Sequence, residues 1–141
     1  MRLSEELRGR TKRYASDIIQ LYVRLPKGRD EARILGKQLL RSGTSVAAHA
    51  REASRARSDS EFCSKLDSLL QEADESELWL ELLRDDCGID AEQVQPLLKE
   101  TGEILAIFTS IVAKLRKKVR SENRQMLKPD GKCGKAEGLK S

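Results

Sequence analysis

The strongest constraint on the fold is a heptad seam in the middle of the chain. Between residues 62 and 87, apolar or small side chains recur at alternating steps of four and three for almost four heptads. The seam consists of Phe62, Leu66, Leu69, Ala73, Ser76, Leu80, Leu83 and Cys87. This spacing places all its members on one face of an α-helix. It is typical of a helix that packs lengthwise against other helices.

Apolar residues at helical spacing also occur before the seam. They predict one helix from Ser4 to Leu25, with Ser4 as its N-cap, and a second helix that begins with Asp30 as its N-cap. Small residues between positions 42 and 50 allow a neighbouring backbone to approach the second helix closely. Ser58 and Glu61 form a capping box, which predicts the start of the seam helix.

The chain after the seam predicts a fourth helix and a tail. We expect Gly88 to end the seam helix and Asp90 to cap a helix that continues to about residue 124. Four helices with short turns predict an all-α fold, an antiparallel up-down-up-down four-helix bundle over residues 1–124. Residues 125–141 are expected to form a flexible basic tail.

The cysteines and the hydropathy predict where in the cell the protein is located. Cys63 and Cys87 are expected on one helix, roughly 36 Å apart, so they cannot form a disulfide. Free thiols in a chain without a secretory signal predict a reducing, cytoplasmic location. No apolar run approaches the roughly 20 residues that span a bilayer, so no membrane partner is expected.

Charge is strongly segregated along the chain. The net charge of +4 divides into +5 over residues 2–29, +3 over 30–57, −9 over 58–90, −2 over 91–113 and +7 over 114–141. The chain therefore has a basic start, an acidic middle and a basic end. Five acidic residues of the seam helix could face a neighbouring subunit or remain solvated. They are Asp67, Asp74, Glu77, Glu81 and Asp85.

Two basic clusters are the best lead to a function. They fall on the first turns of the first helix and near the end of the fourth helix. Their members are Arg8, Arg10, Lys12, Arg13, Lys114, Arg116, Lys117, Lys118 and Arg120. In an antiparallel bundle both clusters lie at the same end, where they predict a basic rim that binds phosphates of RNA or DNA. The alternative for the second cluster is that it only complements the helix dipole.

A polar stripe lies beside the apolar face of the second helix. It consists of Gln38, Ser42, Ser45, His49 and Glu52, at steps of four and three. We expect this stripe to fix helix register or a subunit interface, and the alternatives are a solvated face or a ligand site. Trp79 is expected in the core or at an interface, where its N–H needs a partner.

Patterns typical of enzymes and metalloproteins are missing from the sequence. A di-iron bundle needs two Glu-x-x-His motifs, whereas this chain has one histidine. Cys63 lies on an apolar face, where a thiol is usually inert. The sequence contains no glycine-rich phosphate loop and no G-x-S-x-G motif. We therefore expect no catalytic residues, no metal and no cofactor.

Two stretches of sequence carry a family resemblance. Residues 38–53 read QLLRSGTSVAAHAREA, and residues 58–83 combine Ser58, DSEF, KL, QEA, ES and WLELL in that order. This pattern resembles the 23S rRNA intervening-sequence proteins, a family of four-helix-bundle proteins. The resemblance extends from about Tyr14 to Leu115. His49 stands where the family usually has asparagine.

The resemblance implies partners that composition does not. Relatives assemble as five-membered barrels, which implies a homopentamer. The related accessory variability determinants of diversity-generating retroelements bind nucleic acid and a reverse transcriptase. The leading hypothesis is therefore a non-enzymatic, oligomeric nucleic-acid-binding accessory protein that assists a reverse transcriptase. The alternatives are a protein–protein interaction scaffold without nucleic acid, which the surplus apolar surface of the seam helix favours, and a metal-dependent enzyme.

Overall fold

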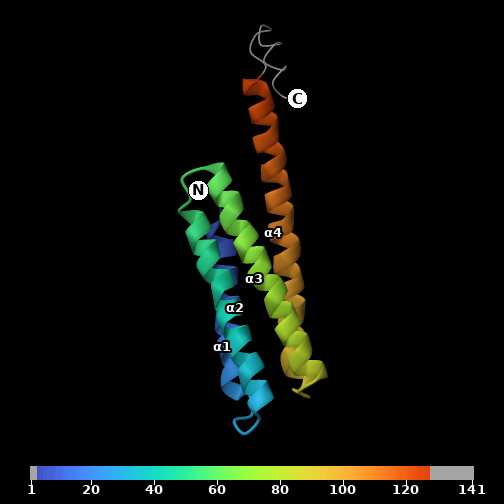
Figure 1. Cartoon of the computed structure of the whole chain (residues 1–141). Coiled ribbons are helices and arrows are strands. Elements are labelled where there is room, and N and C mark those ends of the chain that lie inside the picture. The colour runs from blue at the N-terminus through green and yellow to red at the C-terminus, as the bar shows by residue number, and fades with distance from the viewer. Residues whose placement is uncertain (1–2, 128–141) are drawn as a thin grey trace.

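The chain folds into four helices that run alternately up and down. A computed structural model describes residues 3–127 (Figure 1). The helices are α1 (Glu5–Arg24), α2 (Asp30–Ser54), α3 (Asp59–Asp85) and α4 (Ala91–Met126). Each helix packs along its successor, whereas α1 and α4 contact each other less extensively. No strand occurs within residues 3–127, and the prediction of an all-α four-helix bundle is confirmed.

The end of α4 lies close to the predicted boundary between bundle and tail. Helix α4 continues to Met126, slightly beyond the predicted limit at residue 124. Most of the predicted tail over 125–141 lies outside the described residues, so the flexibility of that tail stays a prediction. Among residues 3–127, no helix is both long enough and apolar enough to cross a bilayer.

Local side-chain hydrogen bonds begin three of the helices. Ser4 accepts a hydrogen bond from the amide of Leu7 at 3.1 Å, and Ser58 accepts one from Glu61 at 3.0 Å. Asp90 caps α4 in the same way, through the amide of Glu92 at 3.0 Å. These three predicted caps are confirmed. Each satisfies an amide that has no carbonyl partner in the first turn.

The predicted N-cap of α2 is wrong by one residue. The cap is Arg29, which makes no capping hydrogen bond through its side chain, and Asp30 is the first residue of the helix. Asp30 and Glu31 together place negative charge in the first turn. They therefore favour the helix through its dipole, and no side-chain cap is needed for that effect.

The predicted placement of both cysteines on one helix is also wrong. Helix α3 ends at Asp85, and Cys87 lies beyond it in the turn to α4. Gly88 has a φ of 68°, the left-handed conformation that glycine adopts most easily. The chain reverses there, and the amide of Ile89 donates a hydrogen bond to the carbonyl of Leu83 at 2.9 Å. Cys87 is buried under this turn, so it completes the seam from outside the helix.

The heptad seam forms the centre of the core. All eight of its residues are buried, and Phe62, Leu69 and Leu80 are almost completely hidden from solvent. The buried residues of α4 end at Val112. Beyond Val112, α4 continues past the turn between α2 and α3, as Figure 1 shows. The last third of this helix therefore has far less of its surface covered than the first two thirds.

A buried polar layer crosses the middle of the bundle, with one residue from each helix. Tyr14 of α1 lies 2.6 Å from the hydroxyl of Thr101 on α4, and Ser42 of α2 lies 2.7 Å from Ser76 on α3. Thr101 donates its own proton to the carbonyl of Leu97, so Tyr14 is the donor in the first pair. Specific polar pairs in a core favour one helix register over others.

The small residues of α2 allow a close contact at Gly43, but with a side chain of α1 and not with the predicted backbone. A Cβ at this position would lie 2.8 Å from Cγ1 of Ile18 on α1, which is closer than normal packing allows. Glycine costs about 1 kcal/mol in a helix relative to alanine. Here that cost is offset by the tight contact between α1 and α2.

Candidate nucleic-acid interface

The basic cluster of α4 is largely unpaired. Lys114, Lys117, Lys118 and Arg120 are exposed, and none makes an ion pair with another residue of the described range 3–127. Arg116 differs, because its Nη2 lies 2.5 Å from Oδ2 of Asp67 on α3. The hydrogen bond to Asp67 is the main reason that the pKa of Arg116 rises. Four of the five cations therefore remain free to attract phosphates.

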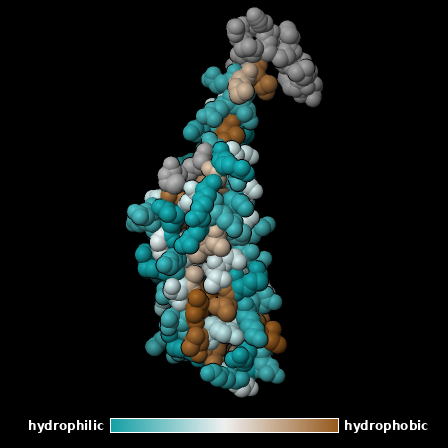
Figure 2. All heavy atoms as spheres, turned by 90° about the vertical axis from the view of Figure 1, so that its left-hand side faces the viewer, coloured by the Kyte–Doolittle hydropathy of each residue, from teal (hydrophilic) through white to brown (hydrophobic). Residues whose placement is uncertain are grey.

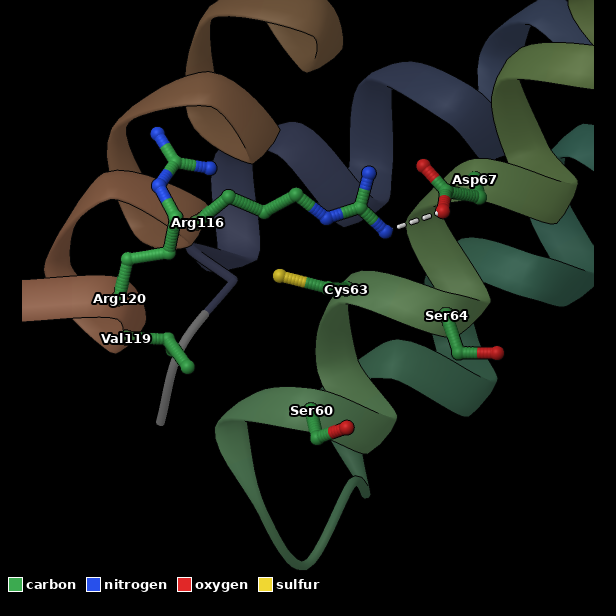
Figure 3. A pocket seen from close by; sticks show the side chains of 7 residues that line it. All are labelled: Ser60, Cys63, Ser64, Asp67, Arg116, Val119 and Arg120. Atoms are coloured by element: carbon green, nitrogen blue, oxygen red, sulfur yellow. Dashed lines mark hydrogen bonds and ion pairs between the residues drawn. The ribbon is translucent and has the colours of Figure 1, made fainter. Parts of the chain in front are cut away.

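A shallow pocket separates the end of α4 from the start of α3. Figure 3 shows Arg116 reaching across from α4 to Asp67, above the thiol of Cys63. Burial raises the pKa of the Cys63 thiol, and this effect outweighs the lowering by Arg116. A thiol with a raised pKa is protonated at neutral pH, so it is a poor nucleophile. The groups of this pocket that can attract an anion are therefore the guanidiniums of Arg116 and Arg120.

The basic cluster of α1 faces two helices, α4 on one side and α2 on the other. The guanidinium of Arg10 makes a two-pronged contact with Glu100 of α4, at 2.7 and 3.0 Å, and also bonds to Glu103. These carboxylates raise the pKa of Arg10. Arg10 therefore contributes chiefly to the contact between α1 and α4. Arg8 and Lys12 face α2 on another side, and Lys12 and Arg13 are exposed.

The two basic clusters lie at the same end of the bundle, as expected, but they do not merge. Arg10 is level with Glu103 of α4, and Lys114 follows eleven residues later. That interval corresponds to roughly 16 Å along the helix axis. The end of α4 therefore presents its cations beyond those of α1, and a partner must be large enough to reach both.

Two arginines at the end of α2, one in the helix and one at its C-cap, were missed in the sequence. Arg51 lines a pocket with Arg8 and Lys12, and Arg55 lines the adjoining pocket. The available signal was weak: Arg51 and Arg55 are four residues apart where α2 ends, and their neighbours depend on how α1 and α2 pair. The basic surface therefore includes α2 as well as α1 and α4.

The polar stripe of α2 divides into buried and exposed parts. Ser42 is buried in the polar layer, Ser45 is half-buried and Gln38 is exposed. His49 lies 3.1 Å from the carboxylate of Glu52, which also lies 3.4 Å from Lys65 of α3. The stripe thus contributes to contacts between α2 and α3 of one chain. Its predicted role between subunits stays a prediction.

Helix α3 carries the acidic counterpart of these basic surfaces. Glu72 and Glu75 both contact Arg41 of α2 within the same chain. Glu77 has a raised pKa, chiefly through burial and then through the charges of Glu81 and Asp74. Asp74, Glu77 and Glu81 therefore form a negative surface on α3, which would repel a phosphate.

Trp79 is half-buried against the core, and its Nε1 is buried without a hydrogen-bond partner among residues 3–127. Within the same range, no three or more His, Cys, Asp or Glu side chains are grouped so as to hold a metal ion. The expectations of no metal, no cofactor and no catalytic residue remain predictions.

These features define a class of protein: an all-α bundle with two clusters of cations near the end from which α4 projects. A family model described as the 23S rRNA-intervening sequence protein matches residues 6–110, and the chain belongs to this family. The predicted family resemblance is therefore confirmed. The matched range includes the α1 cluster and Arg51 but ends before Lys114.

A solved structure supports the same relationship. It is a protein of unknown function from the S23 ribosomal protein family of Bacteroides thetaiotaomicron, with 37% sequence identity and a TM-score of 0.69. The similarity covers 75% of this chain and 94% of that chain. A search of curated proteins gave no match.

Proposed function

We propose that this chain is a non-enzymatic nucleic-acid-binding accessory protein that holds RNA or DNA by its phosphates. The observation that carries the proposal is a set of four exposed cations on α4 that make no ion pair with any residue of 3–127: Lys114, Lys117, Lys118 and Arg120. They lie on the part of the helix that follows its last buried residue, Val112. Cations that are neither buried nor paired are available to an anionic partner.

The helix dipole does not account for these cations. The dipole acts within the last turn of a helix, and α4 ends at Met126. Lys114 lies twelve residues earlier, about three turns from that end. Arg124 already occupies the last turn. The cluster therefore calls for a different explanation, and phosphate binding supplies one.

Phosphates are a better target than bases on this surface. Base stacking requires aromatic side chains, and the described residues from 113 to 127 include none. Binding through phosphates tolerates sequence variation and weakens as salt rises, because each contact releases counterions. The family name refers to ribosomal RNA, which makes a structured RNA the natural first ligand.

The finer parts of the proposal concern assembly and partners. We propose a cytoplasmic homopentamer, in which five copies of the basic end form a ring, and a reverse transcriptase as a protein partner. The family resemblance supports these statements. Light scattering coupled to size-exclusion chromatography tests the assembly, and a mass of one or two subunits would contradict it.

A protein–protein scaffold is the second candidate. On α3, Leu78 is 46% exposed and the buried Nε1 of neighbouring Trp79 has no partner within residues 3–127. Exposed apolar side chains and aromatic side chains near the surface are typical of an interface. A stoichiometric protein partner that survives nuclease treatment of a native pull-down would favour this candidate.

A matched pair of variants tests nucleic-acid binding. The first replaces the four free cations of α4 by glutamine, and the second replaces four exposed cations elsewhere: Arg24, Lys27, Lys37 and Lys99. Both variants lose the same charge. Fluorescence anisotropy with a structured RNA and a duplex DNA, at several salt concentrations, measures affinity and salt slope.

We expect the α4 variant to bind at least tenfold more weakly than the wild type. For duplex DNA, the slope of log K against log [salt] should become shallower by about three to four. The matched control should keep nearly the wild-type slope. Unchanged binding in the α4 variant would overturn the proposal. Equal losses in both variants would also overturn it, because they would indicate a general effect of net charge.

A further inference from the structure

Half of the residues that line a small pocket between α1 and α2 are cations. The pocket has a volume of about 190 Å³, and its lining residues are Glu5, Arg8, Gly9, Lys12, Ala47 and Arg51. We infer that this pocket binds one phosphate group of the nucleic acid, separately from the α4 cluster. The inference rests on the proposed function and names a further contact for the same ligand.

The pocket follows from the pairing of two helix faces. Arg8 and Lys12 are four residues apart on α1, so their side chains point to the same side, about 6 Å apart at their bases. Arg51 approaches from α2, and the small residues Gly9 and Ala47 leave space between the helices. Three positive side chains therefore surround one concavity of a size suited to a phosphate.

The guanidinium of Arg8 lacks a partner that an anion would supply. Its Nε is buried and has no hydrogen-bond partner among residues 3–127. A buried donor without an acceptor is unfavourable, because it has lost its hydrogen bond to water. A phosphate oxygen in the pocket provides that acceptor after a small rotation of the side chain. Guanidinium groups also match phosphate geometry with two parallel hydrogen bonds.

The charges around the pocket are not balanced within the chain. Glu5 is the one carboxylate that lines it, against the three cations Arg8, Lys12 and Arg51. The adjoining pocket adds Arg55 and Glu52, but Glu52 already contacts His49 and Lys65. The local excess of positive charge therefore remains for a ligand.

The position of the pocket suits a ligand that also reaches α4. The pocket lies near the start of α1 and the end of α2, which is the end from which α4 projects (Figure 1). Figure 2 shows the face of α1 and α2, where hydrophilic side chains predominate toward this end and apolar ones gather toward the other. The exposed Ile19, Val23 and Ile34 lie in the halves of these helices nearer their connecting turn. A nucleic acid that binds this pocket therefore lies on the polar end of this face, from which α4 projects.

A nuclear magnetic resonance experiment tests the pocket directly. In full-length protein at low salt, inorganic pyrophosphate is titrated while the Nε–Hε signal of Arg8, assigned with Arg8→Gln, is observed. We expect a saturable shift of this signal in the wild type and its loss in Arg51→Gln. The matched control is Arg24→Gln, an exposed arginine at the far end of α1, in which the shift should persist.

RNA binding distinguishes the pocket from the wider proposal. Arg51→Gln should flatten the salt slope of RNA binding by about one, and Arg24→Gln should not. RNA binding with an unchanged slope in Arg51→Gln would overturn the pocket inference and leave the proposed function standing. No RNA binding by the wild type, with the pyrophosphate shift retained, would overturn the proposed function and reduce the pocket to a free-phosphate site. No pyrophosphate shift would overturn the pocket as an anion site of either kind.

Discussion

The two parts of α4 differ in how much of their surface is buried. From residue 91 to 112, buried residues recur along the helix and Phe108 is 1% exposed. From residue 113 to 126, Leu115 and Val119 are only half-buried and cations dominate the surface. The buried residues of α4 all lie in the first part, whereas the second part borders the start of α3 across the shallow pocket. Packing therefore separates a structural segment from one that is available to a partner.

The largest expected difference between the two parts concerns stability. Phe108→Ala removes a large, fully buried side chain and should lower the free energy of unfolding by about 3–5 kcal/mol. Val119→Ala, at a half-buried site, should cost less than about 1.5 kcal/mol. Urea denaturation followed by circular dichroism measures both. Equal losses would show that the two parts do not differ in packing.

The polar layer of the packed region predicts an alkaline loss of stability. Burial raises the pKa of Tyr14 to about 12, although the hydroxyls of Thr101 and Ser76 lower it. The folded state thus favours the neutral phenol. Stability from this group is complete below the unfolded pKa near 10 and is lost as the pH rises to about 12.

This loss should amount to about 2–3 kcal/mol, from a difference of about two pKa units. Unfolding free energies of the wild type and Tyr14→Phe, measured between pH 9 and about 12, isolate the tyrosine because other groups titrate equally in both. A wild-type curve parallel to that of Tyr14→Phe would contradict the prediction.

The smallest effect on stability is expected at the boundary between the two parts. Asp67→Asn removes the carboxylate that contacts Arg116, and both side chains are more than 40% exposed. Exposed ion pairs contribute little, so the unfolding curve should barely change. RNA binding should strengthen, with a salt slope steeper by about one, because Arg116 becomes available to phosphate. Weaker RNA binding in Asp67→Asn would show that Asp67 orients Arg116 for the ligand.

Much of the fold could be predicted because its signals are local. Ser4, Ser58 and Asp90 cap their helices through residues two or three positions away. The seam depends only on a repeat along one helix, and all its members are buried. The errors at Asp30 and Cys87 occur at helix ends, where a shift of one or two residues changes little energy.

The candidate site was less predictable because it depends on pairs of helices. The sequence identified the cations of α1 and α4. It did not show that Glu100 and Glu103 form ion pairs with Arg10. It also gave no sign that Arg51 meets Arg8 and Lys12 across α1 and α2. Such contacts join residues far apart in the chain, and their geometry depends on which helix faces meet.

The sequence by itself therefore determined four helices, their order, the seam and the segregation of charge. These properties follow from periodicity and composition, which act over a few residues at a time. Only the tertiary structure decided which cations are paired, which remain free and where a pocket forms. The physical reason is that a charge is compensated by the groups beside it in space, and those groups come from other helices.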